Sequence, residues 1–128
     1  MASREKNKAL ARKEAKAAGG ARAVLRGYRM SSRKARVLAN LIRGKTVEAA
    51  VTMLIFQQRK AALPLRKLLD SAVANAESRD MDLDKLLVAR VLEDKGPVMK
   101  RWLPRAHGRA TPLRKQTSHV TVELVEAE

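Results

Sequence analysis

Residues 95–116 form an acid-free segment that carries seven lysines and arginines and no aspartate or glutamate. Clustered ammonium and guanidinium groups are suited to neutralising the phosphates of a nucleic acid or another polyanion. The segment also holds three of the four prolines and the only tryptophan, with too little apolar surface to form a core of its own. We therefore predict a basic arm that projects from a folded body. Its cations are Lys95, Lys100, Arg101, Arg105, Arg109, Arg114 and Lys115.

A second set of cations lies on a predicted helix over about residues 32–43, for which Ser31 or Ser32 is a suitable N-cap. Arg33 and Lys34 fall in its first turn, where the positive end of the helix dipole disfavours each cation by roughly 0.3–1 kcal/mol. A phosphate at this end would be attracted by both charges and by the free backbone N–H groups. The pattern favours an anion-binding helix end, and a solvated basic face is the alternative.

The whole chain is strongly basic, with 28 Lys and Arg against 13 Asp and Glu and a net charge of +15. Acidic residues gather between the two basic regions and near the C-terminus, which indicates defined anion-binding surfaces. Nucleic acid is therefore the expected partner, and a membrane surface is the weaker alternative. The chain has no cysteine, no apolar signal segment and no run of about eighteen apolar residues. We expect a soluble intracellular protein.

The spacing of Asp80, Asp82 and Asp84 resembles the start of a calcium-binding loop. Such a loop requires glycine at its sixth position and glutamate at its twelfth, and these positions hold Lys85 and Val91. A polar turn is therefore the expected structure, and we predict no metal site.

The remaining candidates for catalysis are equally poor. The two histidines, His107 and His119, have no cysteine partners and no helical zinc-binding spacing. Ser118 is the direct neighbour of His119, and adjacent strand residues point to opposite faces, which is wrong for a nucleophile and its base. The basic arm holds no carboxylate for a metal-dependent nuclease. We predict no enzymatic activity and no cofactor.

Apolar periodicity predicts a strand and three helices in the first part of the chain. Residues 21–29 alternate as a short half-buried strand that precedes the first helix. A second, short helix is capped by Thr46, and a third, longer helix runs to about Glu77. Pro64 leaves two possible starts for the third helix. It begins there, with proline at its first position, or begins near Gln58 and kinks.

Two further segments, residues 86–93 and 120–124, alternate as strands and are expected to pair antiparallel. Between them, residues 93–117 would run out for about twelve residues and return, so that the tip stands on the order of 40 Å from the sheet. The predicted fold class is α+β, with three helices packed on a small three-stranded antiparallel sheet and a long extended β-hairpin. Residues 21–128 would form this single RNA-binding domain, and residues 1–20 a disordered basic N-terminal tail.

Six blocks of sequence, in order and at matching spacing, closely resemble the large-subunit ribosomal protein family numbered twenty-two, in its bacterial form. The likeness covers about residues 21–125. Two departures stand out, since Ser32 lies where the family usually has proline, and residues 78–84 are shorter and lack the usual glycine. The six blocks are residues 31–36, 41–45, 71–77, 96–101, 104–110 and 114–119.

This resemblance implies a structural constituent of the large ribosomal subunit that binds large-subunit ribosomal RNA and supports subunit assembly. It also implies a hairpin that lines the nascent-peptide exit tunnel, in a region associated with macrolide sensitivity. The expected partners are ribosomal RNA, neighbouring ribosomal proteins and the nascent polypeptide, with no membrane, and the expected location is the ribosome in the cytoplasm. Charge alone leaves a free-standing nucleic-acid chaperone or nucleoid protein as the alternative.

The predicted site residues form two groups, a cationic RNA-binding group and a hairpin tip that the resemblance places in the tunnel. Trp102 would either stack on a nucleobase or stiffen the tip by packing on its neighbours. The RNA-binding group is Arg22, Arg26, Arg29, Arg33, Lys34, Arg36, Arg43, Lys95, Lys100, Arg101, Arg105, Arg109, Arg114 and Lys115. The tip group is Met99, Lys100, Arg101, Trp102, Leu103, Pro104 and Arg105.

Overall fold

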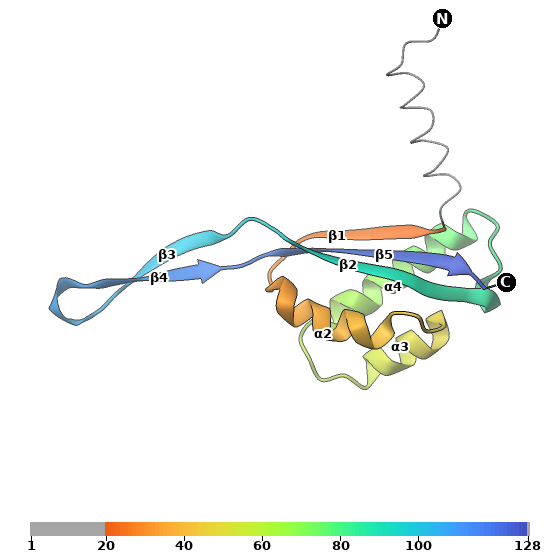
Figure 1. Cartoon of the computed structure of the whole chain (residues 1–128), viewed down its shortest axis with the longest axis horizontal. Helices are drawn as coiled ribbons and strands as arrows, with labels where there is room; N and C mark the ends of the chain where they lie inside the picture. The colour runs from red at the N-terminus through yellow and green to blue at the C-terminus, as the bar shows by residue number, and fades with distance from the viewer. Residues whose placement is uncertain (1–19, 128) are drawn as a thin grey trace, which may run out of the picture.

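The computed structural model describes residues 20–127, so nearly all of the predicted N-terminal tail (residues 1–20) lies outside the described residues. Within them, a three-stranded sheet carries three helices on one side, and a two-stranded hairpin extends away from this body (Figure 1). This arrangement confirms the predicted α+β class, the small antiparallel sheet and the long hairpin.

The sheet has the order β1-β5-β2, formed by β1 (Arg22–Tyr28), β2 (Leu86–Lys95) and β5 (Ser118–Glu126). Both neighbouring pairs are antiparallel, which confirms the predicted pairing of β2 with the last strand. Strand β5 is central, and its alternate side chains form the sheet's half of the core. These are Val120, Val122 and Leu124, all buried.

A β-bulge in β2 changes which side chains face the core. The sequence pattern placed Val88 and Leu92 on one face, but the register of β2 against β5 shifts between Val88 and Arg90. One extra residue in a strand reverses the alternation beyond it. Val91 is therefore fully buried, and Leu92 is 41% exposed.

The helices are α2 (Ser32–Ile42), α3 (Val47–Ile55) and α4 (Ala62–Glu77). Each buries an apolar stripe at 3–4 spacing, as the periodicity predicted. Thr46 caps α3 by accepting a hydrogen bond from the backbone N–H of Ala49. Gly44 follows α2 with a φ of +75°, a left-handed conformation that glycine adopts without steric cost. The largest fully buried helical side chains are Leu38, Ile42, Leu65 and Leu69.

Helix α4 begins at Ala62, with Ala61 as its N-cap, so Pro64 is its third residue. Neither predicted start is correct, although the true start is close to the first of them. A proline is tolerated here because N–H groups in the first turn have no intrahelical acceptor. A short 3-10 helix, Leu83–Lys85, then leads from α4 into β2.

The hairpin consists of β3 (Met99–Pro104) and β4 (Ala110–Lys115), which pair in continuous register from Met99 opposite Lys115 to Pro104 opposite Ala110. Every residue of both strands is exposed. The chain reverses over residues 105–109, where a 3-10 turn, Ala106–Gly108, contains His107 with a φ of 59°. The predicted position of the tip is therefore corrected, because residues 99–104 form the outgoing strand and only Arg105 belongs to the turn.

Candidate nucleic-acid interface

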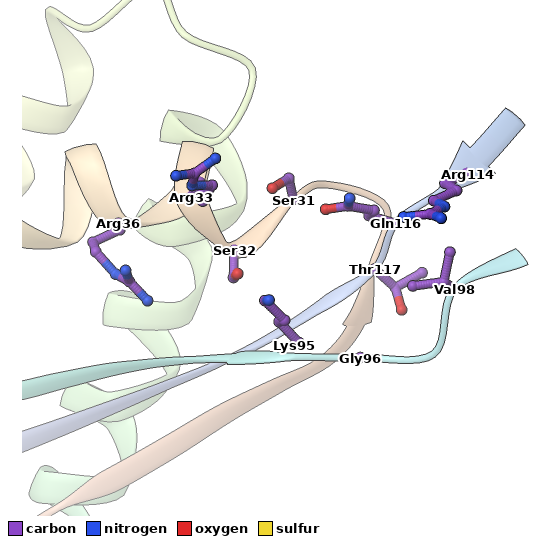
Figure 2. Close-up of a pocket in the computed structure, with 10 residues that line it drawn as sticks. All are labelled: Ser31, Ser32, Arg33, Arg36, Lys95, Gly96, Val98, Arg114, Gln116 and Thr117. Atoms are coloured by element: carbon purple, nitrogen blue, oxygen red, sulfur yellow. The ribbon is translucent and has the colours of Figure 1, made fainter.

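The N-terminus of α2 faces the base of the hairpin across a cleft of about 600 Å³, which we call the basic cleft (Figure 2). One wall comes from α2 and its N-cap, and the other from the ends of β2 and β4 and their links to the body. None of the described residues that line it is acidic. They are Ser31, Ser32, Arg33, Arg36, Lys95, Gly96, Val98, Arg114, Gln116 and Thr117.

A neighbouring hollow extends this cationic surface toward the hairpin. It shares Arg33 and Arg114 with the basic cleft and adds Arg29, Lys34 and Lys115. The structure thus brings together cations from the turn after β1, the first turn of α2 and each of the two legs of the hairpin. Seven of the predicted RNA-binding residues line the basic cleft or this neighbouring hollow. They are Arg29, Arg33, Lys34, Arg36, Lys95, Arg114 and Lys115.

The hairpin base is held in place by short-range contacts between its two legs. The backbone N–H of Gly96 donates to the carbonyl oxygen of Thr117 at 2.9 Å, and the Thr117 hydroxyl donates to the carbonyl oxygen of Pro97. Gly96 lies so close that a Cβ atom there would be 2.5 Å from Thr117 Oγ1. These contacts hold together the two legs that carry Lys95 and Arg114.

His119 links the edge strand β1 to this same region. Its Nδ1 accepts a hydrogen bond of 2.9 Å from the backbone N–H of Gly27, which has a φ of +64° at the irregularity in β1. The sequence gave no sign of this contact, because it joins residues 92 positions apart. His119 therefore has a structural partner, and its neighbour Ser118 is fully buried.

Glu93 pairs with two of the predicted RNA-binding arginines. Its carboxylate lies 3.4 Å from Arg36 Nε and 3.2 Å from Arg43 Nη2, and its side chain is only 6% exposed. Arg43 also donates to the carbonyl oxygen of Val91 at 2.6 Å and to Asn40 Oδ1 at 2.8 Å. Sequence reasoning missed this cluster, and it means that Arg43 is engaged within the fold while Arg36 is partly neutralised at the edge of the cleft.

Arg33 and Lys34 differ from this pair, since neither makes a side-chain hydrogen bond or ion pair with any residue that the structure describes. Ser31 is the N-cap of α2 by position, but its side chain makes no capping hydrogen bond. The first turn of the helix contains no acidic residue. The positive end of the helix dipole is thus reinforced by two cations and left without a counter-charge from the described part of the chain.

The other predicted RNA-binding residues lie along the edges of the molecule. Arg22, on β1, is 4.0 Å from Glu123, a contact at the limit of an ion pair. Arg105 and Arg109 border a shallow hollow at the hairpin turn, together with His107. Lys100 and Arg101 lie on exposed β3, and Arg26 lies on β1.

Trp102 lies on β3 opposite Pro112 of β4 and is 67% exposed. Its pairing partner is therefore a residue of the returning strand. The exposed area leaves an aromatic surface accessible on the arm.

The aspartates before β2 form a polar turn. The Asp82 side chain accepts a hydrogen bond from the backbone N–H of Asp84 and lies 3.2 Å from the Lys85 ammonium group. Among residues 20–127 there is no group of three or more histidine, aspartate or glutamate side chains able to hold a metal ion. In the same range, no helix is long and apolar enough to cross a membrane.

Together, the fold and the basic cleft define a small, basic α+β protein with a projecting hairpin. Comparison with known proteins identifies the family. The chain belongs to the ribosomal protein L22p/L17e family, whose sequence pattern matches residues 23–125. This confirms the resemblance seen in the sequence.

Three relatives show how close the similarity is. The chain is 51% identical over 107 residues to the large ribosomal subunit protein uL22 of Myxococcus xanthus, an alignment covering 81% of this chain and 94% of the relative. It is 49% identical over 107 residues to uL22 of Syntrophotalea carbinolica, covering 83% and 97%. It is 50% identical over 109 residues to uL22 of Thermoanaerobacter sp., covering 84% and 98%.

Family membership makes this chain a ribosomal protein of the large subunit, of the bacterial uL22 type, and places it in the ribosome. Members of this family are structural proteins, so the chain is not an enzyme.

Proposed function

We propose that this protein binds large-subunit ribosomal RNA through the basic cleft and the cations along the hairpin, and thereby supports assembly of the subunit in the cytoplasm. The single observation that carries the proposal is the cleft itself. Cations from α2 and from both legs of the hairpin converge there, and no acidic residue lines it among those described. An RNA backbone supplies the missing negative charge.

Binding would draw its free energy mainly from the release of cations condensed on the RNA. Each phosphate neutralised by lysine or arginine makes the logarithm of affinity fall by roughly 0.7–0.9 for each tenfold rise in salt. Recognition would follow the shape of the RNA, because the deep groove of an A-form helix hides base edges from side chains. Arg33, Lys34, Lys95, Arg114 and Lys115 are the cations best placed for this contact.

For the hairpin, we propose a position on the wall of the nascent-peptide exit tunnel. Residues 99–105 would line the tunnel together with the rest of the turn, residues 106–109. Three observations support an extended element in contact with a partner: its strands are exposed on both legs, its turn is cationic, and Trp102 is exposed. Trp102 would stack on a base or, alternatively, pack against Pro112 to stiffen the arm. Neighbouring ribosomal proteins and the nascent peptide would be the other partners.

Crosslinking within intact subunits tests this proposal. A photoreactive group attached at position 100, through Lys100→Cys, should crosslink to large-subunit RNA and to a stalled nascent chain. The same group at Lys67→Cys, on the exposed surface of α4, is the matched control and should give no crosslink to the nascent chain. Failure of position 100 to reach the nascent chain would refute the tunnel assignment. If positions 100 and 67 give no RNA crosslinks, and Arg114→Cys gives none either, the proposed RNA contact is refuted.

A further inference from the structure

We propose that the N-terminus of α2 is a seat for one phosphate group of the RNA backbone, formed by the Ser32 hydroxyl, the backbone N–H groups of Ser32 and Arg33 and the cations of the basic cleft. This inference rests on the proposed RNA binding and makes it more specific. It assigns a defined ligand to one point of the cleft and a role to an uncharged residue.

The N-terminus of α2 has the features of an anion-binding site. Helix α2 has eleven residues, and the Ser31 side chain does not cap it. Its first turn holds Arg33 and Lys34 and no acidic residue. Free N–H groups at the N-terminus of a helix carry a partial positive charge and point outward along the axis, where a phosphate oxygen accepts their hydrogen bonds.

Ser32 gives an independent indication of a ligand. The residue is only 3% exposed, and its hydroxyl makes no hydrogen bond to any residue that the structure describes. Its small exposed area faces the basic cleft, so the hydroxyl is available to donate to a ligand there. Figure 2 shows the Ser32 hydroxyl directed into the gap between α2 and Lys95, on the wall of the cleft. A phosphate oxygen in this gap would be the missing acceptor.

The cations around Ser32 complete the seat. Lys95 reaches toward Ser32 from the end of β2 (Figure 2), and Arg33 and Arg114 line the same cleft. Arg36 contributes less charge, because Glu93 lies 3.4 Å from its guanidinium group. The helix end, the hydroxyl and these three cations are the kinds of donor that phosphate sites use.

A proline in place of Ser32 gives a sharp test of the seat, because Ser32 is the first residue of α2. Proline is favoured at the first position of a helix and supplies neither a hydroxyl nor an N–H group. Ser32→Pro therefore removes the hydroxyl and one N–H donor of the seat while remaining compatible with the start of α2.

The test measures binding of the full-length protein to large-subunit ribosomal RNA by filter retention over a series of salt concentrations. Ser32→Ala and Ser32→Pro should each weaken binding, by about tenfold for the loss of a hydrogen bond to a charged group. The salt dependence should stay the same, because neither change removes a cation. Ser32→Thr keeps the hydroxyl and should bind like the wild type. Ser71→Ala, on exposed α4, is the matched control.

Backbone amide NMR with inorganic phosphate, on the same full-length chain, separates the possible ligands. Saturable shifts at Ser32 and Arg33 that ribosomal RNA reverses by competition support an RNA phosphate. Shifts that RNA leaves in place would mean a site for free phosphate and would overturn the inference. Thermal melts check that each variant is folded. If Ser32→Ala does not fold, Ser32→Pro provides the same test.

Two outcomes are distinguishable in the binding series. If both Ser32 variants bind like the wild type while Arg33→Gln binds more weakly, the phosphate seat is wrong and RNA binding by the cleft stands. If the wild type and every variant bind RNA with the same weak affinity, the proposed function itself fails.

Discussion

At the scale of single residues, the cleft contains cations in two different states. Arg36 and Arg43 share the carboxylate of Glu93, whose side chain is nearly buried, whereas Arg33 and Lys34 have no such partner in the described structure. The sequence pattern places all four in the RNA-binding group and distinguishes Arg33 and Lys34 only by their position in the first turn of the helix. Their difference depends on Glu93, which lies 57 and 50 residues further along the chain, and no local pattern indicates so distant a contact.

Glu93→Gln should lower the free energy of unfolding by roughly 1 kcal/mol, since it weakens two ion pairs whose arginines are themselves about half exposed to solvent. Chemical denaturation in low and high salt measures this loss, which should shrink as salt screens the pairs. Asp70→Asn, on the exposed surface of α4, removes the same charge and should change stability by less than about 0.5 kcal/mol. An equal effect of the two substitutions would show that the cluster does not stabilise the fold.

At the scale of elements, periodicity predicted most of what positions the cleft. The apolar spacing of α2 and the alternation of β5 were sufficient to place three helices on a three-stranded sheet. Two details escaped. The bulge between Val88 and Arg90 reverses which side chains of β2 face the core, and no glycine or proline in this stretch indicates it. The tip group that the resemblance indicated, residues 99–105, is mostly outgoing strand, because pairing of β3 with β4 extends as far as Pro104 and Ala110.

The hairpin strands should contribute almost nothing to the stability of the body, because every residue of β3 and β4 is exposed. Replacing residues 99–115 by Gly-Gly should change the free energy of unfolding by less than about 0.5 kcal/mol, measured by urea denaturation. Leu38→Ala, in the core, is the contrasting variant and should cost about 2–5 kcal/mol. A comparable loss on removing the hairpin would mean that the arm packs on the body.

At the scale of the whole molecule, the net charge of +15 is distributed unevenly over the surface. The body buries a small aliphatic core and holds two acidic residues of its sheet, Glu93 and Glu123, in ion pairs with arginines. Much of the unpaired positive charge is left around the basic cleft and along the hairpin. This division suits a protein that docks its body on RNA and extends an arm beyond it.

The most direct test of the central claim is the salt dependence of binding to large-subunit ribosomal RNA, for the wild type and for Arg33→Gln combined with Arg114→Gln. Each lost phosphate contact should reduce the slope of log affinity against log salt by about 0.7–0.9, so the double variant should lose about 1.5. The control, Arg59→Gln with Lys67→Gln, removes the same charge outside the cleft and should leave the slope nearly unchanged. A cleft variant whose slope equals that of the control would contradict the account.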